Sequence, residues 1–147
     1  MKNVHKSVLI WYSAEEMFGL VTDVAKYPEF LPWCDHASVL VQEPQGMKAE
    51  IGIAFSGIRQ TFTTRNVHVQ AREVQMNLVD GPFSVLDGRW QFSPLGQAGQ
   101  RACKVGLELH YTFRNAALAA LVGPVFDKIA GNLVDAFVKR AEQVYGA

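Results

Sequence analysis

The sequence contains one residue pair at a spacing used by metal sites, Cys34-Asp35-His36. A cysteine and a histidine two residues later can both bind Zn²⁺, but a structural zinc site needs four ligands, commonly supplied as two such pairs. No second pair at ligand spacing is present. Cys103, His68 and His110 lie singly in segments with strand periodicity. The sequence therefore does not predict a metal site.

Signatures of covalent catalysis and phosphate binding are also missing. The sequence has no Gly-x-Ser-x-Gly turn and no local motif of a cysteine nucleophile. Gly81-Pro82-Phe83 and Gly88-Arg89-Trp90 lack the glycine spacing of a phosphate-binding loop. Carboxylates are scattered singly apart from Glu15-Glu16, and helix capping accounts for that pair. We therefore predict no catalytic residues and no enzyme activity.

The aromatic residues allow two interpretations. Most of them fall on the apolar faces of predicted strands and of the last predicted helix, so they can simply fill a core. Alternatively, sheet and helix leave an apolar cavity lined by rings, which suits a flat or chain-like lipophilic ligand. Periodicity alone does not choose between them. The residues concerned are Trp33, Phe55, Phe62, Phe83, Trp90, Phe92, Tyr111, Phe113, Phe126 and Phe137.

The segment Asp80-Gly81-Pro82-Phe83 also has two interpretations. As a turn between strands it is adequate, because glycine adopts unusual φ values and proline fixes the next φ. As a functional loop it would present Phe83 at the mouth of a pocket, where loops often carry ligand contacts. The direction of Phe83 is open at this stage.

Composition excludes several classes of protein. Fourteen Lys and Arg residues balance 14 Asp and Glu residues, and 49% of the 147 residues are hydrophobic. High apolar content with no net charge excludes a disordered chain. The totals lack the basic excess of generic nucleic-acid binders, although a local patch is compatible with a neutral total. The length is that of one domain, residues 1–147.

The two cysteines and the N-terminus predict a cytoplasmic protein. Cys34 and Cys103 are far apart in the sequence, and we expect both to be reduced thiols. The lysines at positions 2 and 6 are not followed by an apolar stretch of signal-peptide type. The longest apolar stretch, residues 116–126, is shorter than the roughly 18 residues of a membrane span.

Local patterns predict the elements at the N-terminus. Residues 4–11 form a strand, and Ser13-Ala14-Glu15-Glu16 fits a capping box that begins a helix reaching about Val24. In residues 27–33 two prolines bracket at most one helical turn, with Pro28 suited to its first position. We expect a short helix or a rigid corner there.

Alternating apolar residues predict antiparallel strands from residue 34 to residue 113. The clearest examples are residues 47–55 and 103–113, and three more strands cover residues 58–70, 72–79 and 84–92. In the first of these three, the apolar residues change from even positions, such as Phe62, to odd positions, such as Val67. Such a change of parity predicts a bulge or a strong bend.

The last 33 residues have helical periodicity. Residues 116–145 would form about 45 Å of helix at 1.5 Å per residue. Pro124 cannot donate to the carbonyl four residues back, so we expect a kink or a restart there. A helix with so broad an apolar stripe needs a curved sheet to cover it.

Three segments resemble one family. Residues 21–34 (VTDVAKYPEFLPWC), residues 81–92 (GPFSVLDGRWQF) and residues 133–141 (LVDAFVKRA) are similar to three blocks of the START-like coenzyme Q-binding and ribosome-association toxin (RatA) family. That family is also labelled polyketide (oligoketide) cyclase/dehydrase. The resemblance covers nearly the whole chain, and the first block is specific.

The resemblance implies an α+β helix-grip fold (START-like, Bet v 1-like), in which a curved antiparallel β-sheet is wrapped around a long C-terminal α-helix. Mitochondrial relatives bind ubiquinone between sheet and helix in support of respiration, bacterial relatives bind the large ribosomal subunit and block subunit joining, and others are cyclases. The ligand-binding residues would be Trp33, Phe83, Trp90, Tyr111, Phe126, Leu133 and Phe137.

The neutral, aromatic-rich composition favours the first of these functions. An apolar cavity could hold ubiquinone or a related lipid without any required cofactor, with peripheral membrane contact for ligand exchange. Large-subunit binding, the alternative, needs a basic surface. The cations concerned alternate with acids and have the pattern of ordinary solvated faces. They are Lys128, Lys139 and Arg140 on the last helix and Arg59, Arg65 and Arg72 on the strands.

A cyclase is the third interpretation, and it lacks a placed acid or base. His110 is the side chain whose removal would test it.

Overall fold

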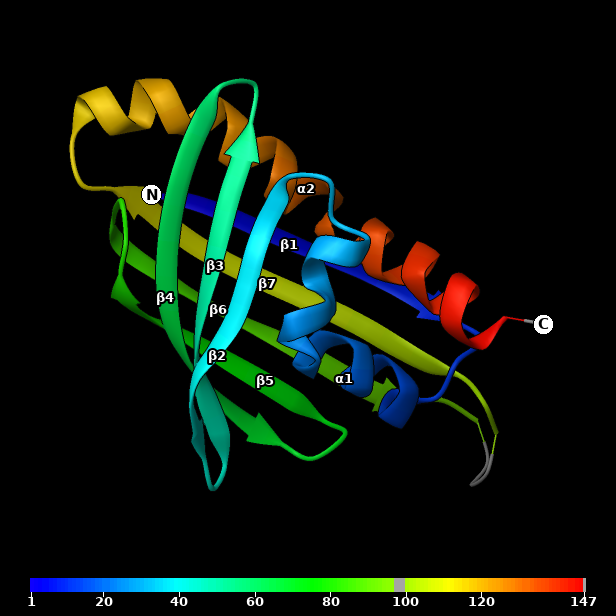
Figure 1. The fold of residues 1–147 in the computed structure, drawn as a ribbon. Helices are drawn as coiled ribbons and strands as arrows, with labels where there is room; N and C mark the ends of the chain where they lie inside the picture. The colour runs from blue at the N-terminus through cyan, green and yellow to red at the C-terminus, as the bar shows by residue number, and fades with distance from the viewer. Residues whose placement is uncertain (97–99, 147) are drawn as a thin grey trace.

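The computed structural model describes residues 1–96 and 100–146 (Figure 1). The elements follow the chain in the order strand, two short helices, six strands and a long helix. They are β1 (Lys2–Ile10), α1 (Ala14–Thr22), the 3₁₀ helix η1 (Val24–Glu29), β2 (Cys34–Glu43), β3 (Gly46–Phe55), β4 (Ile58–Val69), β5 (Glu73–Asp80), β6 (Phe83–Pro94), β7 (Cys103–Phe113) and α2 (Ala116–Tyr145).

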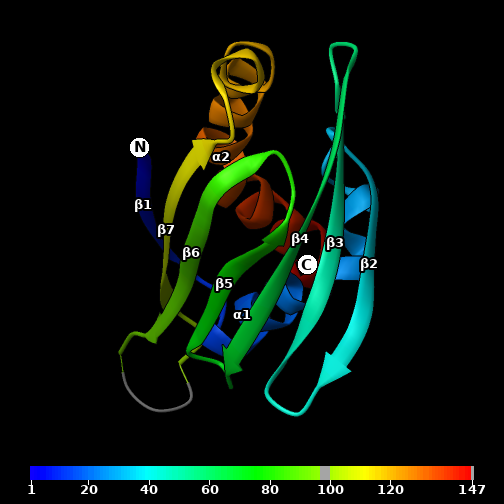
Figure 2. The same cartoon turned by 90° about the vertical axis from the view of Figure 1, so that its left-hand side faces the viewer.

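All strands pair antiparallel in one sheet with the order β1-β7-β6-β5-β4-β3-β2. The first and second strands of the chain are therefore the two edges, and α1 and η1 make the connection between them. The sheet curves strongly, and α2 crosses its concave side (Figures 1 and 2). This is the helix-grip arrangement, and the predicted α+β fold class is confirmed.

Strand alternation places the core as the sequence predicts in most of the sheet. In β7 every second residue from Cys103 to Tyr111 is buried, and in β3 the same holds from Met47 to Ile53. Both strands have neighbours on either side, so their inward residues are covered by the sheet and by α2. Of their outward residues, Lys104 is exposed, Lys48 and Glu50 are half-buried, and Gly52 is buried.

Strand β4 departs from its predicted parity. Its inward positions stay even throughout, so that Thr64 and Asn66 are buried while Val67 and Val69 are 39% and 48% exposed. The apolar residues change parity without a change of face, because two polar residues occupy the core side and two valines the outer side. The bulge that this change of parity predicts is confirmed. A register shift between Thr63 and Thr64 does occur in the pairing of β4 with β5.

The segment from Ser13 to Glu29 was predicted in part. The Ser13 capping box is confirmed: its hydroxyl accepts from the Glu16 amide, and the Glu16 carboxylate accepts from the Ser13 amide. The helix ends at Thr22, and η1 follows at once. Pro28 is the fifth residue of η1 and not the first of a later turn, because the 3₁₀ turns already begin at Val24.

Helix α2 runs without interruption through Pro124, so the predicted restart does not occur. Pro124 and Ala120, whose carbonyl loses its helical donor, are both exposed, and water can reach that carbonyl. By length and apolar composition α2 could cross a membrane, but a core helix meets the same test. Residues of α2 such as Phe126, Val134 and Phe137 are buried in the core of the molecule.

The turn before β6 shows why its glycine is needed. Gly81 has a φ of +151°, and a Cβ there would lie 2.7 Å from the Cβ of Phe62. This tight turn directs Phe83 inward, where it is 3% exposed and its ring centroid lies 4.9 Å from that of Phe126. The alternative in which Phe83 stands at a pocket mouth is therefore wrong.

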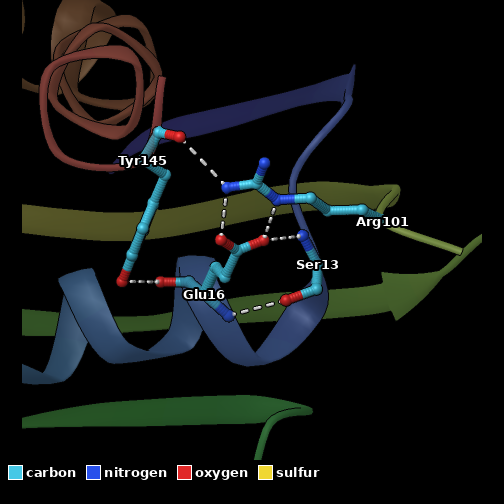
Figure 3. A network of polar contacts seen from close by, with 4 residues as sticks. All are labelled: Ser13, Glu16, Arg101 and Tyr145. Carbon is cyan, nitrogen blue, oxygen red and sulfur yellow. Dashed lines mark hydrogen bonds and ion pairs between the residues drawn. The ribbon is translucent and has the colours of Figure 1, made fainter. Parts of the chain in front are cut away.

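A polar network joins the end of α2 to the start of α1 (Figure 3). Arg101 Nε and Nη2 donate to the two carboxylate oxygens of Glu16 at 2.7 and 2.6 Å. Arg101 Nη2 also donates to the Tyr145 carbonyl at 3.2 Å, and Tyr145 Oη donates to the Glu16 carbonyl at 3.2 Å. The capping box thus also anchors the C-terminal turn of α2. Hydrogen bonding to Arg101 lowers the pKa of Glu16 to about 2.

This network predicts an acid-dependent loss of stability. Because the folded-state pKa of Glu16 lies below its ordinary value of 4.5, its contribution is complete above that value and is lost as pH falls toward 2. Glu16→Gln keeps an N3 acceptor but loses the charge, and we expect it to lower the free energy of unfolding by about 1 kcal/mol at pH 7. The difference from the unaltered protein should shrink toward zero between pH 4.5 and pH 2 in urea titrations.

Glu15→Gln is the matched control for this experiment. Glu15 is exposed in the same helical turn and lies outside the network. A difference between Glu16→Gln and the unaltered protein that stayed constant down to pH 2 would contradict the prediction.

Candidate functional site

Two concave sites beside α2 share a wall formed by Trp33 and Ile129. The inner cavity lies between α2 and the concave face of the sheet, with further lining from η1. The outer groove lies on the solvent side, between α2 and the segment that joins η1 to β2. Trp33 and Ile129 line both.

The inner cavity gathers five of the seven residues predicted to bind a ligand. They are Trp33, Trp90, Phe126, Leu133 and Phe137. The structure does not place Phe83 and Tyr111 at the cavity surface. Both pack behind Phe126, with the Tyr111 ring centroid 4.7 Å from that of Phe126, and Tyr111 Oη donates to Asp127 at 2.5 Å.

The inner cavity is small. Its volume is about 90 Å³, whereas pockets for drug-sized ligands have about 300–1,000 Å³. The rings around it account for this, because they meet edge to face. Phe137, for example, lies 5.4 Å from Tyr27, 5.1 Å from Phe30 and 5.2 Å from Trp90. A few water molecules fit this volume, but a quinone ring would have to displace side chains.

Two polar side chains of β4 face this apolar cavity, and they were missed by the sequence analysis. Thr64 and Asn66 are the buried polar residues in the described part of the chain, and Thr64 Oγ1 donates to Asn66 Oδ1 at 2.8 Å. If inward and outward positions are alternated strictly from Phe62, Thr64 and Asn66 fall on the inward side. Asp87 of β6 also lines the cavity, and the remaining lining is apolar or aromatic apart from Gly88. A few hydrogen-bonding groups in a mostly apolar cavity are the arrangement that fixes the polar end of a lipophilic molecule.

The cysteine and histidine candidates show no reactive arrangement. Burial raises the pKa of both Cys34 and Cys103 to about 11, so at neutral pH they are protonated and inert. The Cys34 thiol donates to the His36 carbonyl, while the His36 ring lies 3.0 Å from Asp35. His110 is outside both sites and contacts Asn3 at 2.6 Å.

No group of three or more His, Cys, Asp or Glu side chains suited to a metal ion is found within residues 1–96 and 100–146.

The outer groove has a volume of about 440 Å³ and combines rings with cations. Its walls are residues 30–33, Phe55 and one face of α2 with Lys128, Lys139 and Arg140. Arg140 lies 5.0 Å from the centroid of the Phe30 ring, and the Lys128 ammonium lies 5.4 Å from that of Phe55. The groove joins segments that are distant in sequence.

The structure divides the cations considered for a basic surface into two sets by their position. The three on α2 line one groove. Of those on the strands, Arg59 lies 3.9 Å from Asp35 and Arg65 lies 3.2 Å from Glu43. Their charges are balanced on the outer face of the sheet. On α2, Arg140 also pairs with an acid, Glu29, at 3.0 Å. The solvated-face interpretation therefore suits Arg59 and Arg65 better than the two lysines of α2.

Curated relatives match the chain over nearly its whole length. The chain is 46% identical to the "Ribosome association toxin RatA" of Vibrio cholerae, covering 99% of each chain. It is 42% identical to the protein of the same name in Escherichia coli, covering all of this chain and 91% of that one. A more distant match, 27% identical, is the "Coenzyme Q-binding protein COQ10 homolog B, mitochondrial" of Xenopus laevis, of which 58% is covered.

Solved structures show the same fold. An 18 kDa protein of Caulobacter crescentus is 32% identical with a TM-score of 0.75, and each chain is covered completely. A START superfamily protein of Mycobacterium smegmatis has a TM-score of 0.79 at 20% identity, with 97% of this chain and 98% of that one covered. The family model described as "Polyketide cyclase / dehydrase and lipid transport" matches residues 10–138. The chain therefore belongs to the polyketide cyclase/dehydrase and lipid transport family.

Proposed function

We propose that this protein acts by associating with the ribosome, binding the large subunit and blocking its joining to the small subunit. The observation that carries the proposal is the full-length similarity, at 42–46% identity, to bacterial proteins named ribosome association toxins. The proposal reverses the order that the sequence patterns favour, in which lipid binding comes first. It places the protein in the cytoplasm, with ribosomes.

The distribution of charge supports this function despite a net charge of zero. Three cations of α2 lie together along one groove, where the lining includes one acid, Asp135. The Asp135 carboxylate lies 3.3 Å from Lys6, so a cation offsets its charge. Glu29 pairs with Arg140 at 3.0 Å, so the uncompensated positive charge of the groove comes from Lys128 and Lys139. A protein with balanced totals therefore has a locally basic surface, and such a surface suits a ribosomal partner.

Sedimentation at low magnesium tests this function. Purified protein in excess over ribosomes is expected to reduce the peak of joined ribosomes by about half and to migrate with the free large subunit. Bovine serum albumin at the same concentration serves as the inert control. An unchanged subunit profile, with the protein remaining at the top of the gradient, would rule the function out.

A second candidate function is the binding of a lipophilic molecule with a polar end, such as a quinone. It is favoured by Thr64 and Asn66 in the apolar inner cavity, and a relative named as a coenzyme Q-binding protein supports it. Trp33, Trp90, Phe126, Leu133 and Phe137 would contact the ligand. Such binding requires the cavity to widen beyond about 90 Å³.

Filling the inner cavity separates the two functions. Ala49 is 1% exposed and lines the cavity, so Ala49→Leu adds an isopropyl group into that space without changing the surface. We expect the amount of quinone or lipid bound to this variant to be at least tenfold lower than in the unaltered protein, as measured by mass spectrometry of gently extracted protein. Its effect on ribosome sedimentation should match that of the unaltered protein.

Ala120→Leu is the matched control, because it adds the same group at an exposed position of α2. Equal lipid occupancy in both variants would exclude the inner cavity as the binding site.

A further inference from the structure

We infer that the outer groove binds unpaired RNA, and this inference rests on the proposed association with the ribosome. In this assignment Lys128, Lys139 and Arg140 contact phosphates, and a base lies against the rings of the groove.

The spacing of the cations favours an extended polyanion over a small anion. Lys128 and Lys139 are 11 positions apart on a continuous helix, which separates them by roughly 16 Å along its axis. One phosphate or carboxylate cannot contact both. Both lysines are exposed, and neither takes part in an ion pair within the described residues, so their charges are available to a partner.

Arg140 adds a third cation that is already oriented. Its Nη2 lies 3.0 Å from Glu29 Oε1, and its guanidinium lies over the Phe30 ring. Its side chain is 18% exposed, so it has little freedom to lose on binding. An Arg held in this way presents a planar donor group at the end of the groove, close to Lys139.

Aromatic surfaces in the groove suit unstacked bases. Phe55, Trp33 and Phe30 line it together with Pro32 and the aliphatic residues of α2. Proteins that bind unpaired nucleic acid combine cations along the backbone with rings on which bases stack. The volume of about 440 Å³ lies within the range of ligand pockets, so a splayed base can be held there. A flat membrane surface would not reach rings that lie in a concave groove.

Neutralising the two exposed lysines tests the assignment. A fluorescent single-stranded RNA of 12 uridines is titrated with the protein by anisotropy at several salt concentrations. For Lys128→Gln with Lys139→Gln we expect about tenfold weaker binding at low salt. The slope of log affinity against log salt should fall by about 1.4, because each phosphate contact on a single strand contributes about 0.7.

The matched control removes two positive charges outside the groove. Lys104 on β7 and Arg72 in the turn before β5 are exposed and do not line the groove. The double variant with glutamine at both positions should bind within about twofold of the unaltered protein. Phe55→Leu keeps an apolar side chain but removes the ring, and it should weaken binding about fivefold with no change in salt slope.

Ribosome sedimentation with the same variants tests separately whether the protein associates with ribosomes and whether it does so through the outer groove. The assignment is supported if the variant with Lys128→Gln and Lys139→Gln no longer associates with ribosomes while the control with Lys104→Gln and Arg72→Gln still does. Equal ribosome association of both variants would show that the outer groove is not the ribosome-binding surface, while the proposed function would stand. If no form of the protein associates with ribosomes but the lysines still govern RNA binding, the RNA site is supported and its ribosomal role is overturned.

Two further outcomes overturn the RNA site itself. The first is tighter binding to a 12-base-pair RNA duplex than to the single strand. The second is lysine-dependent binding to phosphatidylglycerol vesicles without measurable binding to RNA.

Discussion

The packing of α2 against the concave face of the sheet is the constraint on which the rest of the structure depends. Phe126 and Phe137 stand about three turns apart on the helix and enter two groups of rings contributed by the sheet and by η1. Most of these rings meet edge to face, the geometry in which aromatic side chains attract one another while filling space. The two anchors hold the helix close to the sheet. The inner cavity is what remains between them, and its small size follows from that closeness.

The sheet could be predicted from the sequence where apolar residues face inward. β7 has an apolar residue at every inward position from Cys103 to Tyr111, and α2 keeps its helical stripe for 30 residues. β4 could not be read in this way, because Thr64 and Asn66 face the cavity and Val67 and Val69 face outward. Periodicity assumes that burial and apolarity coincide. A strand that contributes polar groups to a cavity breaks that assumption where a ligand would be contacted.

The candidate site was less predictable than the fold, for a physical reason. Aromatic residues on inward positions were identified, but alternation does not say which of two neighbouring layers a ring occupies. Phe83 and Tyr111 lie one layer behind Phe126, away from the inner cavity. The outer groove was beyond sequence reasoning, because it forms only when Phe30, Phe55 and Lys128, from three separate segments, are brought together. Total charge is equally uninformative here, since acids elsewhere balance the groove's cations.

The wall between the two sites connects their properties. Trp33 and Ile129 face the inner cavity on one side and the outer groove on the other. Protein interiors are close-packed, so a molecule too large for about 90 Å³ would have to displace lining side chains, such as Trp33 or Ile129, or shift α2. Displacement of Trp33 or Ile129 would change the shape of the groove, and a shift of α2 would also move Lys128 relative to Phe55. The inner cavity and the outer groove therefore share Trp33 and Ile129, so a change in the shape of one site alters the other.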